Sequence, residues 1–290
     1  LSLYLTDYTD SELSDCVSGA YTSEKFGSDE IAPLHKLDGK ASVLELWHGP
    51  TCAFKDMALQ ILPHFLVKAI KKTGEDRDVI ILVATSGDTG KAALEGFKDV
   101  KGTKIQVFYP VCGVSKIQKL QMATQDGSNV SVISVDGNFD DAQTGVKKIF
   151  GNQEYVNEAS DLGYVFSSAN SINWGRLVPQ IVYYFYAYSR LVKTGEIKCG
   201  DKINIVVPTG NFGNILAAFY AKEMGLCVDK LICASNQNNV LTDFIKTGVY
   251  DRNRKFETTI SPSMDILISS NLERLLFHMS GKNFKLVKEY

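Results

Sequence analysis

The segment DVIILVATSGDTG, residues 78–90, carries an apolar run of strand length directly into a loop and the start of a helix. The same pattern recurs downstream, with helices expected at 89–100, 115–125 and 140–150 and strands at 104–109 and 130–135. Strands and helices that alternate at this spacing form parallel sheets with right-handed crossovers. The sequence therefore predicts an α/β fold in which helices flank a parallel sheet.

The pattern continues in both directions from this unit. Upstream we expect a strand at 42–47 and a helix at 54–72. Downstream we expect a loop at 167–173, a long buried helix at 174–193 with its tyrosines in the core, a strand at 202–207, a helix at 213–224 and a strand at 230–234. Residues 1–30 are polar and acidic, and we expect helical turns or loop there, outside the core.

The composition narrows the classes of protein. With 290 residues the chain exceeds the usual size of one core, so two lobes are expected. Lys and Arg total 31 against 33 Asp and Glu, which leaves no basic field for nucleic acid or anionic lipid. The longest apolar run, Val79 to Ala84, is far shorter than the roughly 20 residues that cross a bilayer. We therefore expect neither a nucleic-acid nor a membrane partner.

Cysteine and histidine usage also argues against a disulfide framework and against a metal site. The 6 cysteines form no C-x-x-C pair, which favours reduced thiols in a cytoplasmic protein. The 4 histidines lack metal-ligand spacing, so no metal site is expected. Residue 1 is Leu and no signal peptide is recognisable, so we expect a truncated start.

Residues 207–214, VPTGNFGN, lie between an expected strand and an expected helix. Glycines there let backbone amides turn toward an anion, and the helix behind adds the positive end of its dipole. A phosphate cradle is one interpretation, and a plain strand-to-helix turn is an equally good one. The loop lacks the G-x-G-x-x-G pattern and the Lys of a P-loop, which argues against NAD and ATP.

The loop at 85–90 offers the hydroxyls of Ser86 and Thr89 beside backbone amides, which suits a carboxylate. Capping of the helix by Asp88 or Thr89 is the simpler alternative for this loop taken alone. Two anion-binding loops in one chain favour the functional interpretation.

Lys55 stands at the start of an apolar helix, where a solvated lysine is less expected. Burial would lower the pKa of its amine, and a neutral amine can form a Schiff base with an aldehyde cofactor. A structural lysine that reaches water is the alternative. For His48 we favour a polar niche over a role in a site, because no base partner can be assigned to it.

Residues 168–176 place amides, hydroxyls and a guanidinium at a helix entrance. This segment suits bidentate recognition of a second phosphate. Capping of the helix by Asn170 or Ser171 is the alternative. Lys91 either adds positive charge near the carboxylate loop or is an ordinary exposed lysine.

Four of these stretches together resemble the threonine synthases. Residues 48–56, HGPTCAFKD, look like the lysine motif of that family, and 84–90, 168–173 and 208–214 occur in the family's order and approximate spacing. The resemblance covers about residues 40 to 235. It implies a two-lobed pyridoxal-phosphate enzyme of fold type II, the tryptophan synthase β type, with the cofactor in the cleft between lobes.

The resemblance also implies roles for individual residues. Lys55 would carry pyridoxal phosphate as a Schiff base and act as the catalytic residue. The cofactor phosphate would be held by Gly210, Asn211, Phe212, Gly213 and Asn214. The substrate carboxylate would meet Ser86 and Thr89, and its phosphate Asn170, Asn173 and Arg176, with Lys91 as a further contact.

The implied reaction is that of threonine biosynthesis, in which O-phospho-L-homoserine and water give L-threonine and phosphate by γ-elimination and β-addition. A related phospho-lyase or hydroxyamino-acid dehydratase that releases a 2-oxo acid is an alternative, as is a non-catalytic binder. We expect a cytoplasmic monomer or homodimer with a small-molecule substrate.

The resemblance finally implies an assignment of lobes. Residues 1–77 would begin the large cofactor lobe, 78–150 would form the small lobe with the carboxylate loop, and 151–290 would complete the large lobe. Family members are longer, and we expect the partner of the pyridine nitrogen beyond Tyr290.

Overall fold

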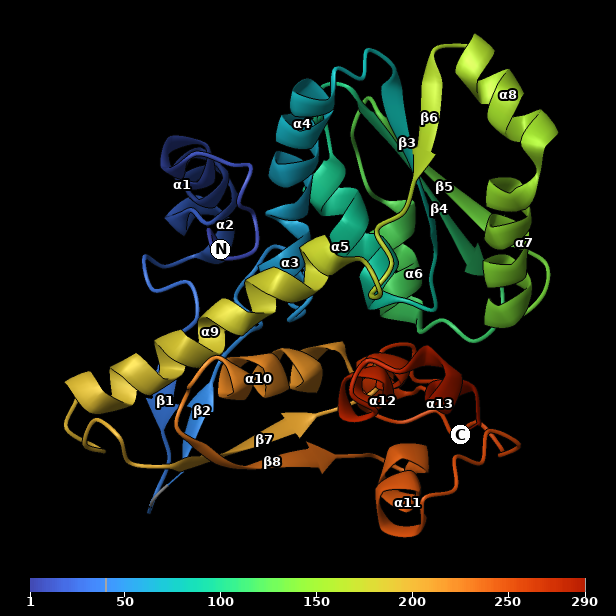
Figure 1. The fold of residues 1–290 in the computed structure, drawn as a ribbon. Coiled ribbons are helices and arrows are strands. Elements are labelled where there is room, and N and C mark those ends of the chain that lie inside the picture. The colour runs from blue at the N-terminus through green and yellow to red at the C-terminus, as the bar shows by residue number, and fades with distance from the viewer. Residues whose placement is uncertain (40, 290) are drawn as a thin grey trace. The chain divides into compact units, whose positions relative to one another are not determined.

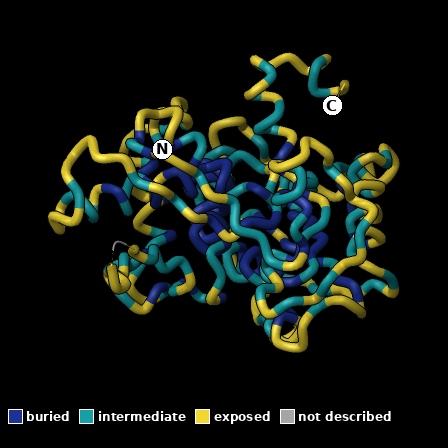
Figure 2. The backbone as a smooth tube through the Cα atoms, turned by 90° about the horizontal axis from the view of Figure 1, so that it is seen from below, coloured by how far each residue is buried: buried dark blue, intermediate teal, exposed yellow. Residues whose placement is uncertain are grey.

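The computed structural model describes residues 1–39 and 41–289. The chain divides into two compact units, Leu1–Pro179 and Gln180–Tyr290 (Figure 1). No helix in the described part of the chain is long and apolar enough to cross a membrane. Buried and exposed segments are distinguished in Figure 2, where the C-terminal end shows only exposed and intermediate residues.

The first unit is built on a parallel sheet of four strands in the order β5-β4-β3-β6. The strands are β3 (Asp78–Ala84), β4 (Thr103–Pro110), β5 (Val130–Val135) and β6 (Tyr164–Ser167). Three of them confirm the predicted strands. β6 was not predicted, because its four half-buried residues show neither an apolar run nor a clear alternation. We expected residues 78–150 to form this sheet by themselves, and β6 adds residues 164–167 to it. The lobe boundaries stay a prediction.

Helices cover both faces of this sheet, which explains the unbroken apolar run of β3. Successive side chains of a strand point to opposite faces. Val79, Ile81 and Val83 therefore pack into the core with α5 (Asp88–Phe97). Leu82 and Ala84 pack on the other face with α7 (Phe139–Gly151). Figure 1 shows α4 (Leu62–Thr73) and α5 on one side of the sheet and α7 with α8 (Gln153–Asp161) on the other. The helix α6 (Lys116–Ala123) follows β4.

The predicted helix at 54–72 is two helices, α3 (Asp56–Leu59) and α4 (Leu62–Thr73). Pro63 stands in the first turn of α4, where its missing N–H costs no hydrogen bond and the new helix can begin. Gly96 of α5 faces the carbonyl oxygen of Leu59, and a Cβ at this glycine would collide with it. The close approach fixes the short helix α3 against α5.

The expectation that residues 1–30 lie outside the core is wrong. The helix α1 (Asp10–Ala20) begins at a capping box formed by Thr9 and Glu12, and α2 (Ser23–Phe26) follows it. Leu13, Cys16 and Ala20 of α1 are buried with Ile61 and Phe65. Their spacing places them on one face of a helix, but two of them are small residues, so the apolar stripe is inconspicuous. A short antiparallel pair, β1 (Leu34–Lys36) and β2 (Ser42–Leu44), comes next.

The second unit contains the parallel pair β7 (Ile203–Pro208) and β8 (Val228–Ala234), joined by α10 (Gly213–Glu223). These elements confirm the predicted order of strand, helix and strand. The long helix α9 (Trp174–Lys193) begins in the first unit and continues into the second, and Tyr183, Tyr184 and Tyr188 on it are buried as expected. Four elements of this unit were not predicted: α11 (Val240–Thr247), the 3-10 turn η1 (Pro262–Met264), α12 (Leu272–Met279) and α13 (Phe284–Glu289). In the first unit, α8 and β1 were not predicted either.

Candidate active site

Lys55 immediately precedes α3, and its amine is almost completely buried. Only 7% of the residue is exposed, and its Nζ lies 3.4 Å from Oδ2 of Asp88. Burial lowers the pKa of this amine, while the Asp88 carboxylate partly restores it and the nearby Arg176 lowers it further. Lys55 is therefore held inside the protein with a strengthened tendency to be neutral, as a Schiff-base lysine requires.

The turn before Lys55 is built around the carboxylate of Asp56. This residue is fully buried, and Thr51 donates to it twice, from its backbone N to Oδ2 at 2.8 Å and from its hydroxyl to Oδ1 at 2.7 Å. A Cβ at Gly49 would lie 2.6 Å from Oδ2 of Asp56, so only glycine leaves room for the carboxylate. Burial raises the pKa of Asp56 to about 6, against the lowering effect of the Thr51 hydrogen bonds. The turn before Lys55 is thus held by hydrogen bonds between two residues of the same motif, Thr51 and Asp56, which are five positions apart.

His48 lies beside this turn with its Nε2 2.6 Å from Oε2 of Glu45. The side chain is half-buried. The structure therefore supplies the partner that could not be assigned from the sequence, and it is an acidic residue three positions away.

The loop after β3 is shaped by Thr85, whose Oγ1 accepts hydrogen bonds from the amides of Gly87 and Gly90 at 3.0 and 2.9 Å. The N-cap of α5 is Gly87, without a side-chain cap, so neither Asp88 nor Thr89 has the capping role considered above. Ser86 and Thr89 are half-buried, and in the described part of the chain neither hydroxyl has a hydrogen-bond partner. Both hydroxyls can therefore meet a carboxylate.

Asp88 connects this loop to Lys55 and to α6. Its Oδ1 accepts a hydrogen bond of 2.5 Å from Nε2 of Gln118, while its Oδ2 faces Lys55. A Cβ at Gly87 would collide with the amide of Gln118, so glycine is needed for this approach. Gln118 is buried and also completes the capping box of α6 with Ser115. Sequence analysis missed Gln118: its place three residues after Ser115 fits a capping box, but the contact with Asp88, 30 residues away, has no local signal.

The loop after β6 forms the entrance of α9. Asn173 donates from Nδ2 to the carbonyl of Ser168 at 2.9 Å and accepts from the amide of Gly175 at 2.9 Å, so Asn173 carries out the capping expected of Asn170 or Ser171. Because β3 and β6 are parallel neighbours, this loop and the loop at 85–87 follow the same edge of the sheet. The carboxyl edge of a parallel sheet is the usual place for ligand binding.

Arg176 and Lys91 complete the residues predicted in the first unit. Arg176 is buried and donates from Nη1 to the carbonyl of Ala169 at 3.0 Å, and desolvation lowers its pKa to about 10. Lys91 lies on α5 with its Nζ 3.3 Å from Oε2 of Glu95, and it also donates to Oε1 of Gln125. The charge of Lys91 is thus already engaged by its own neighbours.

The glycine loop, defined here as Gly210 to Asn214, joins β7 to α10 in the second unit. Phe212 is the N-cap of α10 and adopts φ of 64°, in the left-handed region that non-glycine residues rarely enter. Within residues 1–39 and 41–289, the amides of Asn211 to Asn214 have no protein acceptor. Successive free amides at a helix N-terminus form a cradle for an anion such as a phosphate.

Residues far along the chain hold the glycine loop. Ser269 donates to the carbonyl of Gly210 at 2.6 Å, and Asn271 donates to the carbonyl of Asn211. A Cβ at Gly210 would lie 3.2 Å from Cα of Met264, so the loop is packed tightly against this later segment. Sequence analysis missed these contacts, which join residues about 60 positions apart.

The side chain of Asn214 points to α9. Its Oδ1 accepts hydrogen bonds from the hydroxyls of Tyr184, at 2.6 Å, and Tyr183. Burial raises the pKa of Tyr184, so this hydroxyl remains a donor. If Asn214 contacts a phosphate, it does so with its backbone amide or its remaining side-chain donors.

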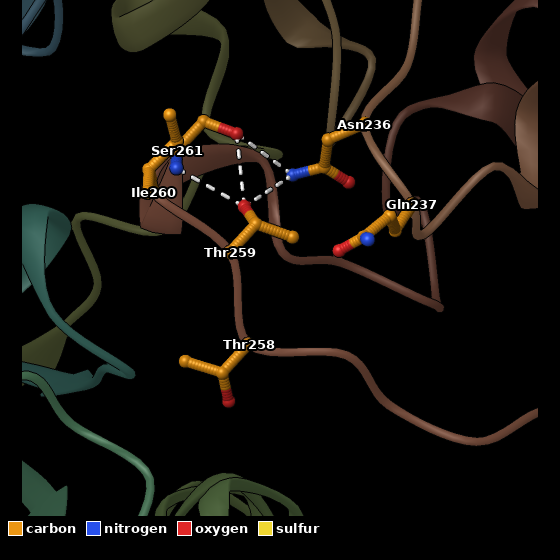
Figure 3. A pocket seen from close by; sticks show the side chains of 6 residues that line it. All are labelled: Asn236, Gln237, Thr258, Thr259, Ile260 and Ser261. Atoms are coloured by element: carbon orange, nitrogen blue, oxygen red, sulfur yellow. Dashed lines mark hydrogen bonds between the residues drawn. The ribbon is translucent and has the colours of Figure 1, made fainter.

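A cavity of about 660 Å³ opens at the carboxyl end of β8. Figure 3 shows its lining: Asn236, Gln237, Thr258, Thr259, Ile260 and Ser261. Asn236 donates to the hydroxyls of Thr259 and Ser261 and to the buried carboxylate of Asp265. The polar network ties the loop after β8 to the segment that leads to Ser269. The sequence did not predict this cavity.

Comparison with known proteins decides the family. The chain matches the family described as pyridoxal-phosphate dependent enzyme over residues 30–289. This protein belongs to that family. The predicted resemblance, the fold type II architecture and the cofactor, pyridoxal phosphate, are thereby confirmed at the level of the family.

Three relatives define the likeness more closely. The chain is 47% identical to human threonine synthase-like 1, over 99% of this chain and 39% of that protein. It is 41% identical to the threonine synthase of Saccharomyces cerevisiae, over 97% of this chain and 55% of that protein. The crystal structure of pyridoxal-phosphate-bound threonine synthase from Brucella melitensis superposes with a TM-score of 0.84 at 41% identity, over 96% of this chain and 57% of that chain. The chain thus spans between 39% and 57% of these relatives.

Proposed function

We propose that this pyridoxal-phosphate-dependent enzyme converts O-phospho-L-homoserine and water to L-threonine and inorganic phosphate. The observation that carries the proposal is the buried Lys55, whose amine is biased toward its neutral form beside the loops that follow β3 and β6. The identity to threonine synthases supports the choice of reaction. The roles given to individual residues are part of the proposal.

Two groups of residues would hold the cofactor. The amine of Lys55 suits the aldehyde, and the free amides of the glycine loop suit the phosphate. When bound, pyridoxal phosphate supplies an electron sink that stabilises negative charge at Cα of an amino acid. All other steps fall to side chains of this protein.

Lys55 is the proposed acid and base. Its Nζ, biased toward the neutral form by burial, would take the proton from Cα and give it to the departing phosphate, then carry a proton from Cβ to Cγ, and finally take a proton from the water that adds at Cβ and return it to Cα. Asp88, at 3.4 Å, stabilises the ammonium form that exists between these transfers. The Gln118 amide holds Asp88 in place from the other side.

The two loops at the carboxyl edge of the first sheet would bind the substrate. Ser86 and Thr89 offer hydroxyls to its carboxylate, and Asn170, Asn173 and Arg176 offer donors to its phosphate. With a pKa of about 10, Arg176 remains positively charged near neutral pH despite its burial. Lys91 contributes less in this proposal, because Glu95 and Gln125 already engage its amine.

A second candidate reaction shares the first half of this chemistry. A phospho-lyase or hydroxyamino-acid dehydratase would release a 2-oxo acid and ammonia instead of adding water at Cβ. The chain is 47% identical to threonine synthase-like 1 and 41% identical to yeast threonine synthase, so identity alone does not choose the reaction. A substrate with no phosphate would not need Arg176.

Product analysis separates the candidates. Purified protein with pyridoxal phosphate is incubated with O-phospho-L-homoserine, and phosphate, threonine and 2-oxo acid are quantified. We expect threonine and phosphate in equal amounts. Phosphate accompanied by a 2-oxo acid without threonine would reject the synthase in favour of the phospho-lyase, and no phosphate release would reject both reactions of the phosphate ester, leaving the hydroxyamino-acid dehydratase.

Cofactor attachment tests the non-catalytic alternative. We expect a visible absorption band with added pyridoxal phosphate, and borohydride reduction should attach the cofactor to Lys55, as read by peptide mass spectrometry. Absence of both signals would favour a binder without catalysis.

Light scattering would test our proposal of a monomer or homodimer, and fractionation of the source cells would test the cytoplasmic location.

A further inference from the structure

Two consecutive carbonyl groups of the glycine loop are anchored by one later segment. Ser269 Oγ donates to the carbonyl of Gly210 at 2.6 Å. The backbone N and the Nδ2 of Asn271 both donate to the carbonyl of Asn211 at 3.1 Å. Asn271 is completely buried and Ser269 nearly so, which protects these hydrogen bonds from water.

Anchoring a carbonyl also sets the direction of the next amide. A peptide unit is planar and trans, so its C=O and N–H groups point in opposite directions. The bond from Ser269 therefore turns the N–H of Asn211 away from Ser269, and the bonds from Asn271 turn the N–H of Phe212 away from Asn271. These are two of the amides that lack an acceptor in the described part of the chain.

The anchoring segment is itself held in place. The carboxylate of Asp265 is buried and accepts hydrogen bonds from Asn236 Nδ2 at 2.7 Å and from the amide of Thr259 at 2.9 Å. Met264 packs directly against Gly210. The segment is thus a firm support and can impose an orientation on the glycine loop.

We propose that Ser269 and Asn271 are positioning residues that aim the amides of Asn211 and Phe212 at the cofactor phosphate. The proposal rests on the proposed function, which assigns the glycine loop to that phosphate. The two side chains contact the loop carbonyls and act only through the loop. Removing the Ser269 hydroxyl frees the peptide unit between Gly210 and Asn211 to rotate. Removing the Asn271 side chain leaves the next peptide unit held by the backbone N of Asn271 alone, so in both cases the anion loses part of a preorganised site.

The test compares pyridoxal phosphate with pyridoxal, which has the same aldehyde and no phosphate. The full chain and its Ser269→Ala and Asn271→Ala variants are titrated with each compound, following the absorption band formed with Lys55. We expect Ser269→Ala to lose roughly tenfold in affinity for pyridoxal phosphate, from one weakened set of charge-assisted hydrogen bonds. Asn271→Ala should lose less, because its backbone N still donates to the carbonyl of Asn211. Affinity for pyridoxal should change by less than about twofold, because the phosphate contacts are absent from it.

A matched control is Ser280→Ala, which removes a hydroxyl at the end of α12 that donates to the carbonyls of Phe277 and Asn283. Its affinities for both compounds should stay at the level of the parent protein. If Asn271→Ala does not fold, Ser269→Ala decides the question, because it removes a single hydroxyl. Equal losses for both compounds, or no loss for either, would overturn the positioning role. A parent protein that binds both compounds equally would overturn the phosphate assignment of the loop as well.

Discussion

The turn before Lys55 and the glycine loop are both tight turns, but different parts of the chain support them. At Lys55 the support is local, since Thr51 and Asp56 bond to each other across five residues. At the glycine loop the support comes from Ser269 and Asn271, about 60 residues later. The motif around Lys55 therefore contains its own supporting contacts, whereas the contacts that support the glycine loop come from outside its motif.

Replacing Lys55 should have the largest effect, because it removes the only group proposed to move protons. For Lys55→Ala we expect product formation to fall by roughly a thousandfold or more, with no borohydride-stable adduct at that position. Lys68→Ala, which removes an exposed lysine paired with Asp15, is the control and should retain parent activity. Appreciable turnover by Lys55→Ala would assign the proton transfers to another residue.

The next largest effect is expected at Arg176, which combines a binding role with local support. Arg176→Ala should raise KM for O-phospho-L-homoserine by about 10- to 100-fold, the size of a lost charged hydrogen bond to phosphate. Arg176→Lys should recover part of that loss, because it keeps the charge but not the planar guanidinium. If both variants lowered only thermal stability and left KM unchanged, the contact with Ala169 would be the whole role of Arg176.

The local support at Lys55 predicts a dependence of stability on pH. Burial raises the pKa of Asp56 from 3.8 to about 6, so the folded state binds this proton more tightly than the unfolded chain. The unfolding free energy contributed by Asp56 is therefore greatest below about pH 4 and falls as the pH rises to about 6, by about 3 kcal/mol at most.

Asp56→Asn should remove that part of the decline. Urea unfolding of both proteins at pH 4 and pH 7 measures the difference, and a parallel decline in parent and variant would contradict it. The same variant should shift the acidic limb of the pH-rate profile to lower pH. The reason is that the negative charge of Asp56, which raises the pKa of Lys55, is then absent.

The smallest effect is expected at Lys91, whose amine is already bound. Lys91→Ala should change KM for O-phospho-L-homoserine by less than about threefold, because Glu95 and Gln125 engage its amine and leave little of its charge for the substrate phosphate. A loss as large as that of Arg176→Ala would show that Lys91 leaves Glu95 and Gln125 to bind the substrate phosphate. Steady-state kinetics of the two variants side by side decides this.

Much of the fold followed from periodicity. The strands β3 and β5 have the bounds that the apolar runs predicted, and α9 begins and ends where its helical pattern does. The misses have specific causes. β6 is four residues long, the apolar face of α1 consists largely of small side chains, and Pro63 divides a helix that periodicity alone would continue.

In the candidate site, too, some residues were predicted from the sequence and others were missed. Lys55, Ser86, Thr89, Asn170, Asn173, Arg176 and the glycine loop were recognised because each lies in a short motif at the end of a strand or the start of a helix. Gln118, Ser269 and Asn271 escaped notice, because they act on those motifs from other parts of the chain. The lobe boundaries at 77 and 150 and the individual binding roles stay predictions.

By itself, the sequence determined the family, the parallel α/β pattern and the identity of the buried lysine, because these depend on residue types at short spacing. The tertiary structure decided which carboxylate faces Lys55 and which donors orient the glycine loop. Those pairings join residues 33 and about 60 positions apart, and only packing of the complete core brings such distant groups within hydrogen-bond distance.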